Sequence, residues 1–156
     1  MKMKYVFAVL IGLMTMSFAA WQPDFDTAKK MAREKDQLIL LNFSGSDWCG
    51  SCIRLRKEIF DSEQFSRMAD TTLIMINADF PRNKKNQPDK QAQLQNEALA
   101  DKYNPMGKFP FTVLLNADGE VIASWDGLPK ADAAAFTRQV KSICDANKHQ
   151  AKIERI

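Results

Sequence analysis

The stretch "LILLNFSGSDWCGSCIRLRKEIF", Leu38–Phe60, contains the features that decide the fold. Its first six residues are almost all apolar, which is the pattern of a strand covered on both faces, as in a parallel sheet. A polar turn follows, and after it comes a run whose apolar residues have helical spacing. Two cysteines, Cys49 and Cys52, therefore lie at a strand-to-helix junction.

The C-x-x-C spacing is shared by metal sites, structural disulfides and reactive dithiols. A structural zinc site needs four ligands, and the other candidates, Cys144 and His149, are far away in sequence. Haem attachment requires a histidine directly after the second cysteine, where this chain has Ile53. A purely structural disulfide across so short a loop would remove little entropy from the unfolded chain. The pattern therefore favours a reactive dithiol, with no metal and no cofactor.

The strand-to-helix junction also explains how such a dithiol would react. Backbone N–H groups at the start of a helix are unpaired and the dipole end is positive, so the thiolate of Cys49 is favoured there. We assign Cys49 as the nucleophile. Cys52 lies one helical turn further on, where it can attack a mixed disulfide and release the reduced substrate.

Residues 1–19 predict a secretory signal peptide. A short positive segment precedes the almost wholly apolar run Tyr5–Met16, and small residues follow. Cleavage after Ala19 would leave residues 20–156 as a single domain. A retained membrane anchor is the alternative, although the apolar run is shorter than the roughly 20 residues that span a bilayer. We expect a periplasmic or otherwise extracytoplasmic protein, membrane-bound only through this segment if it stays uncleaved.

Charge and cysteine number exclude other classes. The formal net charge of +3 becomes +1 without Lys2 and Lys4, and the remaining charges alternate in sign along the chain. No nucleic-acid partner is therefore expected. Disulfides persist outside the cytoplasm, but three cysteines cannot all pair within one molecule.

The third cysteine and the sole histidine receive no functional role. Cys144 shares a helical stripe with Phe136, Val140 and Ile143, so we expect a buried, inert thiol rather than a regulatory or intermolecular one. His149 lies in a polar C-terminal tail that we expect to fray.

Apolar periodicity and turn signals predict an order of helix, strand, helix, strand, helix, strand, strand, helix. The expected ranges are Asp24–Lys35, Leu38–Phe43, Ser51–Phe60, Thr72–Ala78, Asp89–Lys102, Phe111–Leu115, Glu120–Trp125 and Ala131–Asn147. A short further turn from Ser62 to Met68 precedes the second strand. This alternation predicts an α/β fold with a central mixed β-sheet flanked by helices.

The amphipathic runs also predict which side chains are buried and which segment is exposed. The expected apolar face after the cysteine pair consists of Ile53, Leu55, Ile59 and Phe60. The expected apolar face of the third helix consists of Leu94, Ala98 and Leu99. The polar, proline-containing segment 79–90 is interpreted as an exposed loop.

The motif and its context resemble the thioredoxin superfamily. "WCGSC", Trp48–Cys52, matches the family's tryptophan-preceded active site in four of five positions, and Ser51 stands where thioredoxin has proline. "GKFPFTVLLNADGEV", Gly107–Val121, is similar to the family's proline loop and hairpin, and Gly127 to its later glycine. The longer "FSGSDWCGSC" is similar to exported bacterial members. The resemblance implies a thioredoxin fold from about Asp24 to Asn147.

The resemblance also implies a substrate groove around the cysteines. Pro110 would be the cis-proline that packs against the pair, and Phe109 would offer backbone groups to an extended substrate strand. We interpret Trp48 as a partly exposed platform for substrate, and Gly50 and Ser51 as further substrate contacts.

One departure from the family concerns the proton of Cys52. Thioredoxin has a buried acid in the strand before the motif and a partner lysine, where this chain has Asn42 and Met75. Loss of both is self-consistent, because either charge left alone in the interior would be costly. Asp47 and Asp79 are the candidates for the group that deprotonates Cys52.

From these features we expect an extracytoplasmic thiol-disulfide oxidoreductase that acts on protein disulfides. The residues between the cysteines, Gly50 and Ser51, carry no charge to stabilise the reduced state, which favours a reductase. Its re-reducing partner would be a membrane electron-donor protein. The alternatives are a redox-quiet binding module that uses the same groove, and an oxidase or isomerase.

Overall fold

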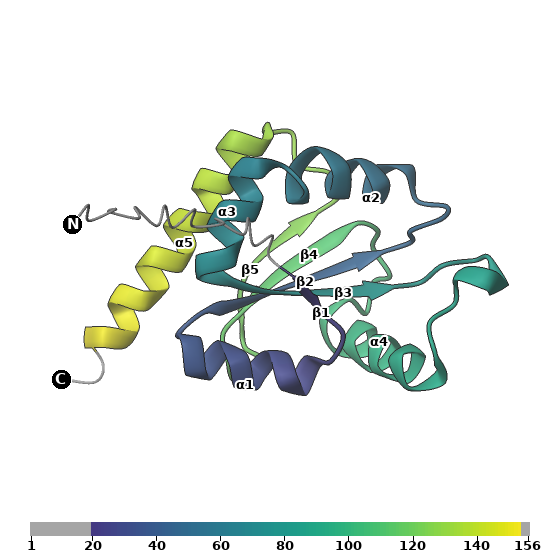
Figure 1. Ribbon diagram of the computed structural model, residues 1–156, viewed down its shortest axis with the longest axis horizontal. Coiled ribbons are helices and arrows are strands. Elements are labelled where there is room, and N and C mark those ends of the chain that lie inside the picture. Colours follow the sequence, from purple (N-terminus) through teal and green to yellow (C-terminus); the bar gives the residue numbers. More distant parts are fainter. Residues whose placement is uncertain (1–19, 154–156) are drawn as a thin grey trace, which may run out of the picture.

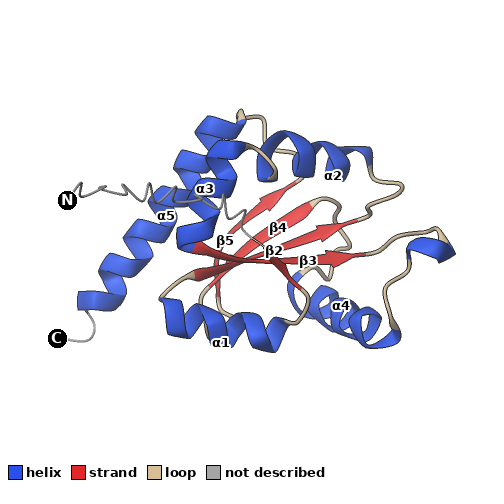
Figure 2. Cartoon of the chain, in the orientation of Figure 1, coloured by secondary structure: helices blue, strands red, loops and turns tan. Residues whose placement is uncertain are grey.

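The computed structural model describes residues 20–153, so the predicted signal peptide lies outside the described part of the chain. Five strands form one sheet in the order β1-β3-β2-β4-β5. Figure 2 shows this sheet at the centre of the molecule. The strands are β1 (Trp21–Gln22), β2 (Leu38–Ser44), β3 (Leu73–Asp79), β4 (Phe111–Leu115) and β5 (Val121–Asp126). Strand β2 is the central strand, with β3 parallel and β4 antiparallel to it.

Helices cover both faces of the sheet, as Figure 1 shows. The α-helices are α1 (Phe25–Lys35), α2 (Gly50–Arg54), α3 (Glu63–Thr72), α4 (Lys90–Tyr103) and α5 (Ala133–Ile153). A π-helical segment, η1 (Leu55–Phe60), continues α2, and a short 3-10 turn, η2 (Lys84–Asn86), precedes α4. Helices α1 and α4 lie on one face, whereas α2, α3 and α5 lie on the other. The predicted mixed sheet flanked by helices is confirmed.

Strand β2 contributes to two hydrophobic cores. Leu38 and Leu40 point to the core that contains residues of η1, α3 and α5, whereas Ile39 and Leu41 point to the core beneath α1 and α4. All four side chains are buried. Burial on both faces explains why this strand is an unbroken apolar run instead of an alternating one.

Helix ends follow capping rules. The Asp24 carboxylate accepts a hydrogen bond from the Thr27 N–H at 2.6 Å, so Asp24 is the N-cap of α1. The Ser62 hydroxyl caps α3 in the same way, but α3 continues to Thr72, beyond the predicted end at Met68.

Two predictions at the chain ends were wrong. Strand β1 was not expected; it has two residues, too few for a period-two pattern. Helix α5 begins at Ala133 behind Asp132 and runs to Ile153, so His149 lies in a helix instead of a frayed tail. No glycine or proline interrupts the chain after Pro129, and the Lys141–Asp145 ion pair at 2.6 Å supports α5.

Two expected apolar faces also need correction. Ile53 is 47 % exposed, because it lines a pocket with the charged residues Arg56 and Lys57 instead of packing in either core. Leu94 is 53 % exposed and Ala98 is exposed as well. Helix α4 instead buries Asn96 beside Leu99, since the Asn96 amide donates to the Asp79 carbonyl at 3.0 Å.

Within residues 20–153, no helix has the length and apolar character needed to cross a membrane.

Candidate active site

The turn between β2 and α2 positions the cysteine pair. The Cys49 N–H donates to the Gly45 carbonyl at 2.9 Å, and the Trp48 N–H donates to the same oxygen at 3.3 Å. A Cβ at Gly45 would lie 2.2 Å from the Trp48 ring, so only glycine fits under the indole. The turn therefore fixes the tryptophan and the first cysteine together.

Cys49 and Cys52 form a disulfide, so the structure represents the oxidised protein. Cys49 is the N-cap of α2, and its sulfur accepts a hydrogen bond from the Cys52 N–H at 3.2 Å. The Ser51 hydroxyl lies 3.6 Å from the same sulfur. Cys49 and Cys52 are 6 % and 3 % exposed. In the reduced protein these donors would stabilise a thiolate on Cys49.

A cis peptide bond joins Phe109 to Pro110, as the family resemblance implies. Pro110 directly precedes β4, whose first residue pairs with Phe43 of β2. The Pro110 carbonyl accepts from the Gly127 N–H at 2.9 Å, and Gly127 has a φ of 78°, which favours glycine. The proline is thus held at the same end of the sheet as the cysteine turn.

Aromatic rings join this turn to the proline loop. Trp48 and Phe109 make an edge-to-face contact with ring centroids 5.5 Å apart, and Phe109 makes a second one with Phe80 at 5.6 Å. Trp48 and Phe109 are half-buried, so each keeps an accessible surface. The Trp48 indole N–H donates to the Phe80 carbonyl at 2.8 Å, and the Arg82 guanidinium lies 4.1 Å from the centroid of the indole.

Asp47 anchors the loop that carries Phe80 and Arg82. Its carboxylate accepts from the backbone N–H groups of Arg82 and Asn83, both at 2.9 Å, and from the Asn86 amide at 3.0 Å. The Arg82 and Asn83 hydrogen bonds lower the pKa of Asp47. No contact joins this carboxylate to Cys52 among the interactions of the described residues. The predicted exposed loop is present, but it is fixed to the active-site turn.

Asn42 occupies the position where the family has a buried acid, and it is fully hydrogen-bonded. Its amide donates to Asn77 Oδ1 at 2.8 Å, and its oxygen accepts from the Thr112 hydroxyl at 3.1 Å. The register of the sheet places Asn42 opposite both residues. Neutral partners on both neighbouring strands therefore satisfy this buried side chain.

Some residues near the site were missed by sequence reasoning. Ile53 is exposed beside Cys52 and lines the same pocket, whereas its spacing had suggested the core. Arg82 had no local pattern that placed it over an aromatic ring. Ser44 and Asn77 also line the Cys52 pocket, and only the β2–β3 register brings them together.

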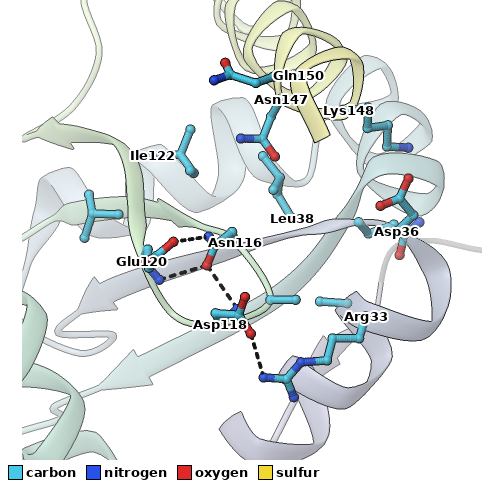
Figure 3. Close-up of a pocket in the computed structure, with 14 residues that line it drawn as sticks. Arg33, Asp36, Leu38, Asn116, Asp118, Glu120, Ile122, Asn147, Lys148 and Gln150 are labelled. Atoms are coloured by element: carbon cyan, nitrogen blue, oxygen red, sulfur yellow. Dashed lines mark hydrogen bonds and ion pairs between the residues drawn. The ribbon is translucent and has the colours of Figure 1, made fainter. Parts of the chain in front are cut away.

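A wider pocket of about 830 Å³ lies at the opposite end of the sheet, where β2 begins at Leu38 (Figure 3). Its lining is mostly polar, and Arg33 and Asp118 form an exposed ion pair there at 3.0 Å. None of the predicted site residues lies in it. Nowhere between residues 20 and 153 do three His, Cys, Asp or Glu side chains gather as metal ligands would.

Cys144 lies in the core formed with η1 and α3 and is fully buried. Burial raises the pKa of its thiol to about 11. The prediction of a buried thiol is confirmed, and the physical basis for its inertness is that the reactive thiolate is scarce at neutral pH.

We expect Cys144 to resist a thiol-alkylating reagent in the folded, oxidised protein. With a pKa of about 11, its thiolate fraction at pH 8 is on the order of one in a thousand. Labelling should be negligible at pH 8, rise steeply toward pH 11 and become complete in denaturant, as followed by mass spectrometry. Rapid labelling of the native protein at pH 8 would contradict this assignment.

The fold and the dithiol together define a class, the thiol-disulfide oxidoreductases of thioredoxin fold. The chain belongs to the thioredoxin-like family: the family model described as "Thioredoxin-like domain" matches residues 25–141. A relative from Chlamydia pneumoniae, "Disulfide bond reductase DsbH", is 34 % identical over 78 % of this chain and 70 % of its own length.

Two further comparisons agree with this family. "Thioredoxin-related protein DsbJ" from Chlamydia pneumoniae is 27 % identical over 62 % of this chain but only 27 % of its own length. The solved structure "DsbH Oxidoreductase" superimposes with a TM-score of 0.75 and 29 % identity, over 83 % of this chain and 86 % of that one.

Proposed function

We propose that this protein is an extracytoplasmic protein-disulfide reductase. The observation that carries the proposal is the Cys49–Cys52 disulfide at the N-terminus of α2. It follows the central strand β2 and a half-buried tryptophan, whose ring contacts Phe109 of the cis-proline loop.

The reaction proceeds through two exchanges of sulfur partners. In the reduced protein the Cys49 thiolate attacks one sulfur of a substrate disulfide, which forms a mixed disulfide and releases the first substrate thiolate. The Cys52 thiolate then attacks Cys49 Sγ and releases the second substrate thiolate. The enzyme ends with the Cys49–Cys52 disulfide, and the substrate has gained two electrons.

The groove around the pair fits a polypeptide substrate. Half-buried Trp48 and Phe109 and exposed Ile53 offer apolar surface near the cysteines. Gly50 is exposed, with no neighbour within 4 Å of a would-be Cβ, so a substrate chain can approach the disulfide closely. The Phe109 backbone pairs with the substrate strand and Pro110 shapes the groove, while Ser51 adds a hydroxyl beside Cys49.

The reducing direction rests on the residues between the cysteines and on one relative. Gly50 and Ser51 bring no positive charge that would stabilise the dithiol and make the disulfide strongly oxidising. The relative from Chlamydia pneumoniae that is 34 % identical carries the name "Disulfide bond reductase". An electron source is then required outside the cytoplasm, and a membrane electron-donor protein is the partner that we propose.

We expect a reduction potential below about −200 mV, measured by equilibration with a glutathione or dithiothreitol couple. The reduced protein should also accelerate the reduction of insulin disulfides. A potential near about −120 mV would contradict the reducing direction, since each ~30 mV changes the equilibrium about tenfold. Absence of any disulfide turnover would contradict the enzymatic function itself.

A further inference from the structure

Cys52 must lose a proton before it can attack the mixed disulfide, if the proposed function holds. Only the thiolate is a nucleophile, and at 3 % exposure Cys52 is poorly placed to give its proton directly to bulk water. Asn42 and Met75 stand where related proteins keep a charged pair, and neither side chain takes up a proton near neutral pH. Another group has to do so.

A polar cluster lies at the end of β2 and β3. Leu38 and Leu40 are apolar on the face of β2 that is covered by η1, α3 and α5, but the next residues on that face are Asn42 and Ser44. The parallel register places Asn42 opposite Asn77. It also places Ser44 opposite Asp79, so the polar residues of both strands meet where the two strands end.

Hydrogen bonds connect this cluster to one carboxylate. Asp79 Oδ1 accepts from the Ser44 hydroxyl at 2.9 Å and from the Ser46 N–H at 2.9 Å. Asp79 Oδ2 accepts from the Ser46 hydroxyl at 2.5 Å. The Ser44 hydroxyl also accepts from the Asn77 amide at 2.9 Å. Asp79 is half-buried, so it can exchange a proton with solvent.

A pocket joins the same hydroxyl groups to the sulfur of the second cysteine. Its volume is about 250 Å³, and its lining includes Cys52, Ser44, Ser46, Asn42 and Asn77. A pocket of this size, with hydroxyl and amide groups in its lining, has room for several water molecules. A water that bridges Cys52 Sγ and a serine hydroxyl would complete a path to the carboxylate.

We propose that Asp79 takes up the proton that Cys52 releases, through Ser44, Ser46 and water in the pocket. The Cys52 S–H bond breaks, and its proton moves to water while water and serine protons shift along the path to the carboxylate. Cys52 becomes a thiolate and Asp79 a neutral acid. Asp79 does not touch the sulfur, so it acts by relay. The path returns the proton when a donor re-reduces the disulfide.

The other charged groups near Cys52 and Asp79 leave this assignment in place. Arg56 and Lys57 line the pocket from η1, and their positive charges favour the Cys52 thiolate. Glu97 of α4 shares a separate small pocket with Asp79 that does not contain Cys52. The Asp47 carboxylate accepts hydrogen bonds from the backbone of loop 80–89, so it is engaged away from Cys52.

Single-turnover kinetics with a symmetric aromatic disulfide measure the reactions of the two cysteines as separate phases. Cys49 attack releases one coloured thiolate, and Cys52 attack on Cys49 releases the second. In Asp79→Asn, which keeps the size and most hydrogen bonds of the side chain, the first phase should be unchanged. The second phase should be about tenfold to a hundredfold slower at neutral pH, and this deficit should close at alkaline pH, where hydroxide removes the proton.

Two outcomes in Asp79→Asn would overturn the proposal: a second phase like that of the wild type at every pH, or one slowed by the same factor at every pH, as a structural defect would produce. Asp118→Asn, an exposed aspartate at the other end of the sheet (Figure 3), is the matched control and should leave both phases unchanged. Failure of the wild type to give either phase would instead refute the proposed function.

A carboxylate added to the pocket provides an independent test. Asn42→Asp in the Asp79→Asn background places an acid beside Cys52 and should restore the neutral-pH rate of the second phase; no restoration would contradict the relay. If Asp79→Asn does not fold, Ser44→Ala combined with Ser46→Ala removes both hydroxyl links and should produce the same pH-dependent loss. A wild-type pH profile in that variant would contradict the proposal.

Discussion

Replacing Cys49 with serine is expected to reduce insulin-disulfide turnover to the uncatalysed rate, a loss of at least about a hundredfold, because a serine hydroxyl does not attack disulfides at neutral pH. The Cys49 sulfur is the one that receives hydrogen bonds at the N-terminus of α2. Cys52→Ser should behave differently: attack on the substrate persists, but the reaction stops at the mixed disulfide. Insulin precipitation and non-reducing gels distinguish the two variants.

Cys144→Ala is the matched control for these substitutions. Because this thiol is fully buried in the core, its removal should leave the turnover rate unchanged while lowering stability modestly. Full reductase activity in Cys49→Ser, or loss of activity in Cys144→Ala with the fold intact, would refute the assigned roles.

Phe136→Ala is expected to lower the free energy of unfolding by about 3–5 kcal/mol. Phe136 is fully buried, and its ring stacks on Phe65 of α3 at 6.1 Å and meets Trp125 of β5 edge-on at 5.3 Å. The substitution removes aromatic contacts that α5 makes with β5 and with α3. Urea unfolding followed by circular dichroism measures the change.

Leu94→Ala is the control for Phe136→Ala, and it concerns a residue whose predicted burial differs from its burial in the structure. Helical spacing predicts a buried Leu94, whereas the structure exposes 53 % of it on α4. Its replacement should change the free energy of unfolding by less than about 0.5 kcal/mol. A loss comparable to that of Phe136→Ala would mean that α4 faces the sheet in the orientation that the spacing predicted.

Elements whose burial is uniform could be predicted from sequence. Leu38–Phe43 is apolar at nearly every position because both faces are covered, and this pattern placed β2 correctly. The starts of α1 and α3 could also be predicted, because Asp24 and Ser62 cap these helices through backbone N–H groups only three positions away. The hairpin around Asn116 and Gly119 also follows from local turn chemistry.

Features that depend on distant partners could not be predicted. The orientation of α4 involves long-range partners such as the Asp79 carbonyl, which accepts from the Asn96 amide, and no local pattern encodes them. The exposure of Ile53 is a second example, since its helical spacing is that of a core residue but the folded chain places it at a pocket with Arg56 and Lys57.

The candidate site likewise has local features that could be predicted and long-range features that could not. The cysteine pair and the turn before it are contiguous in sequence, so their proximity was certain, and the resemblance supplied Pro110 with its cis peptide bond. The sequence also revealed that Asn42 replaces a buried acid. It did not reveal what surrounds Asn42, because Asn77 and Thr112 reach it only through the registers of two different strand pairs.

Trapping the mixed disulfide identifies the sulfur that attacks the substrate. Reduced Cys52→Ser protein should be incubated with a peptide that contains one intramolecular disulfide, and the linked residue should be mapped by proteolysis and mass spectrometry. We expect a single mixed disulfide at Cys49, with Cys144 unlinked. A peptide linked to Cys144, or no mixed disulfide at all, would contradict it.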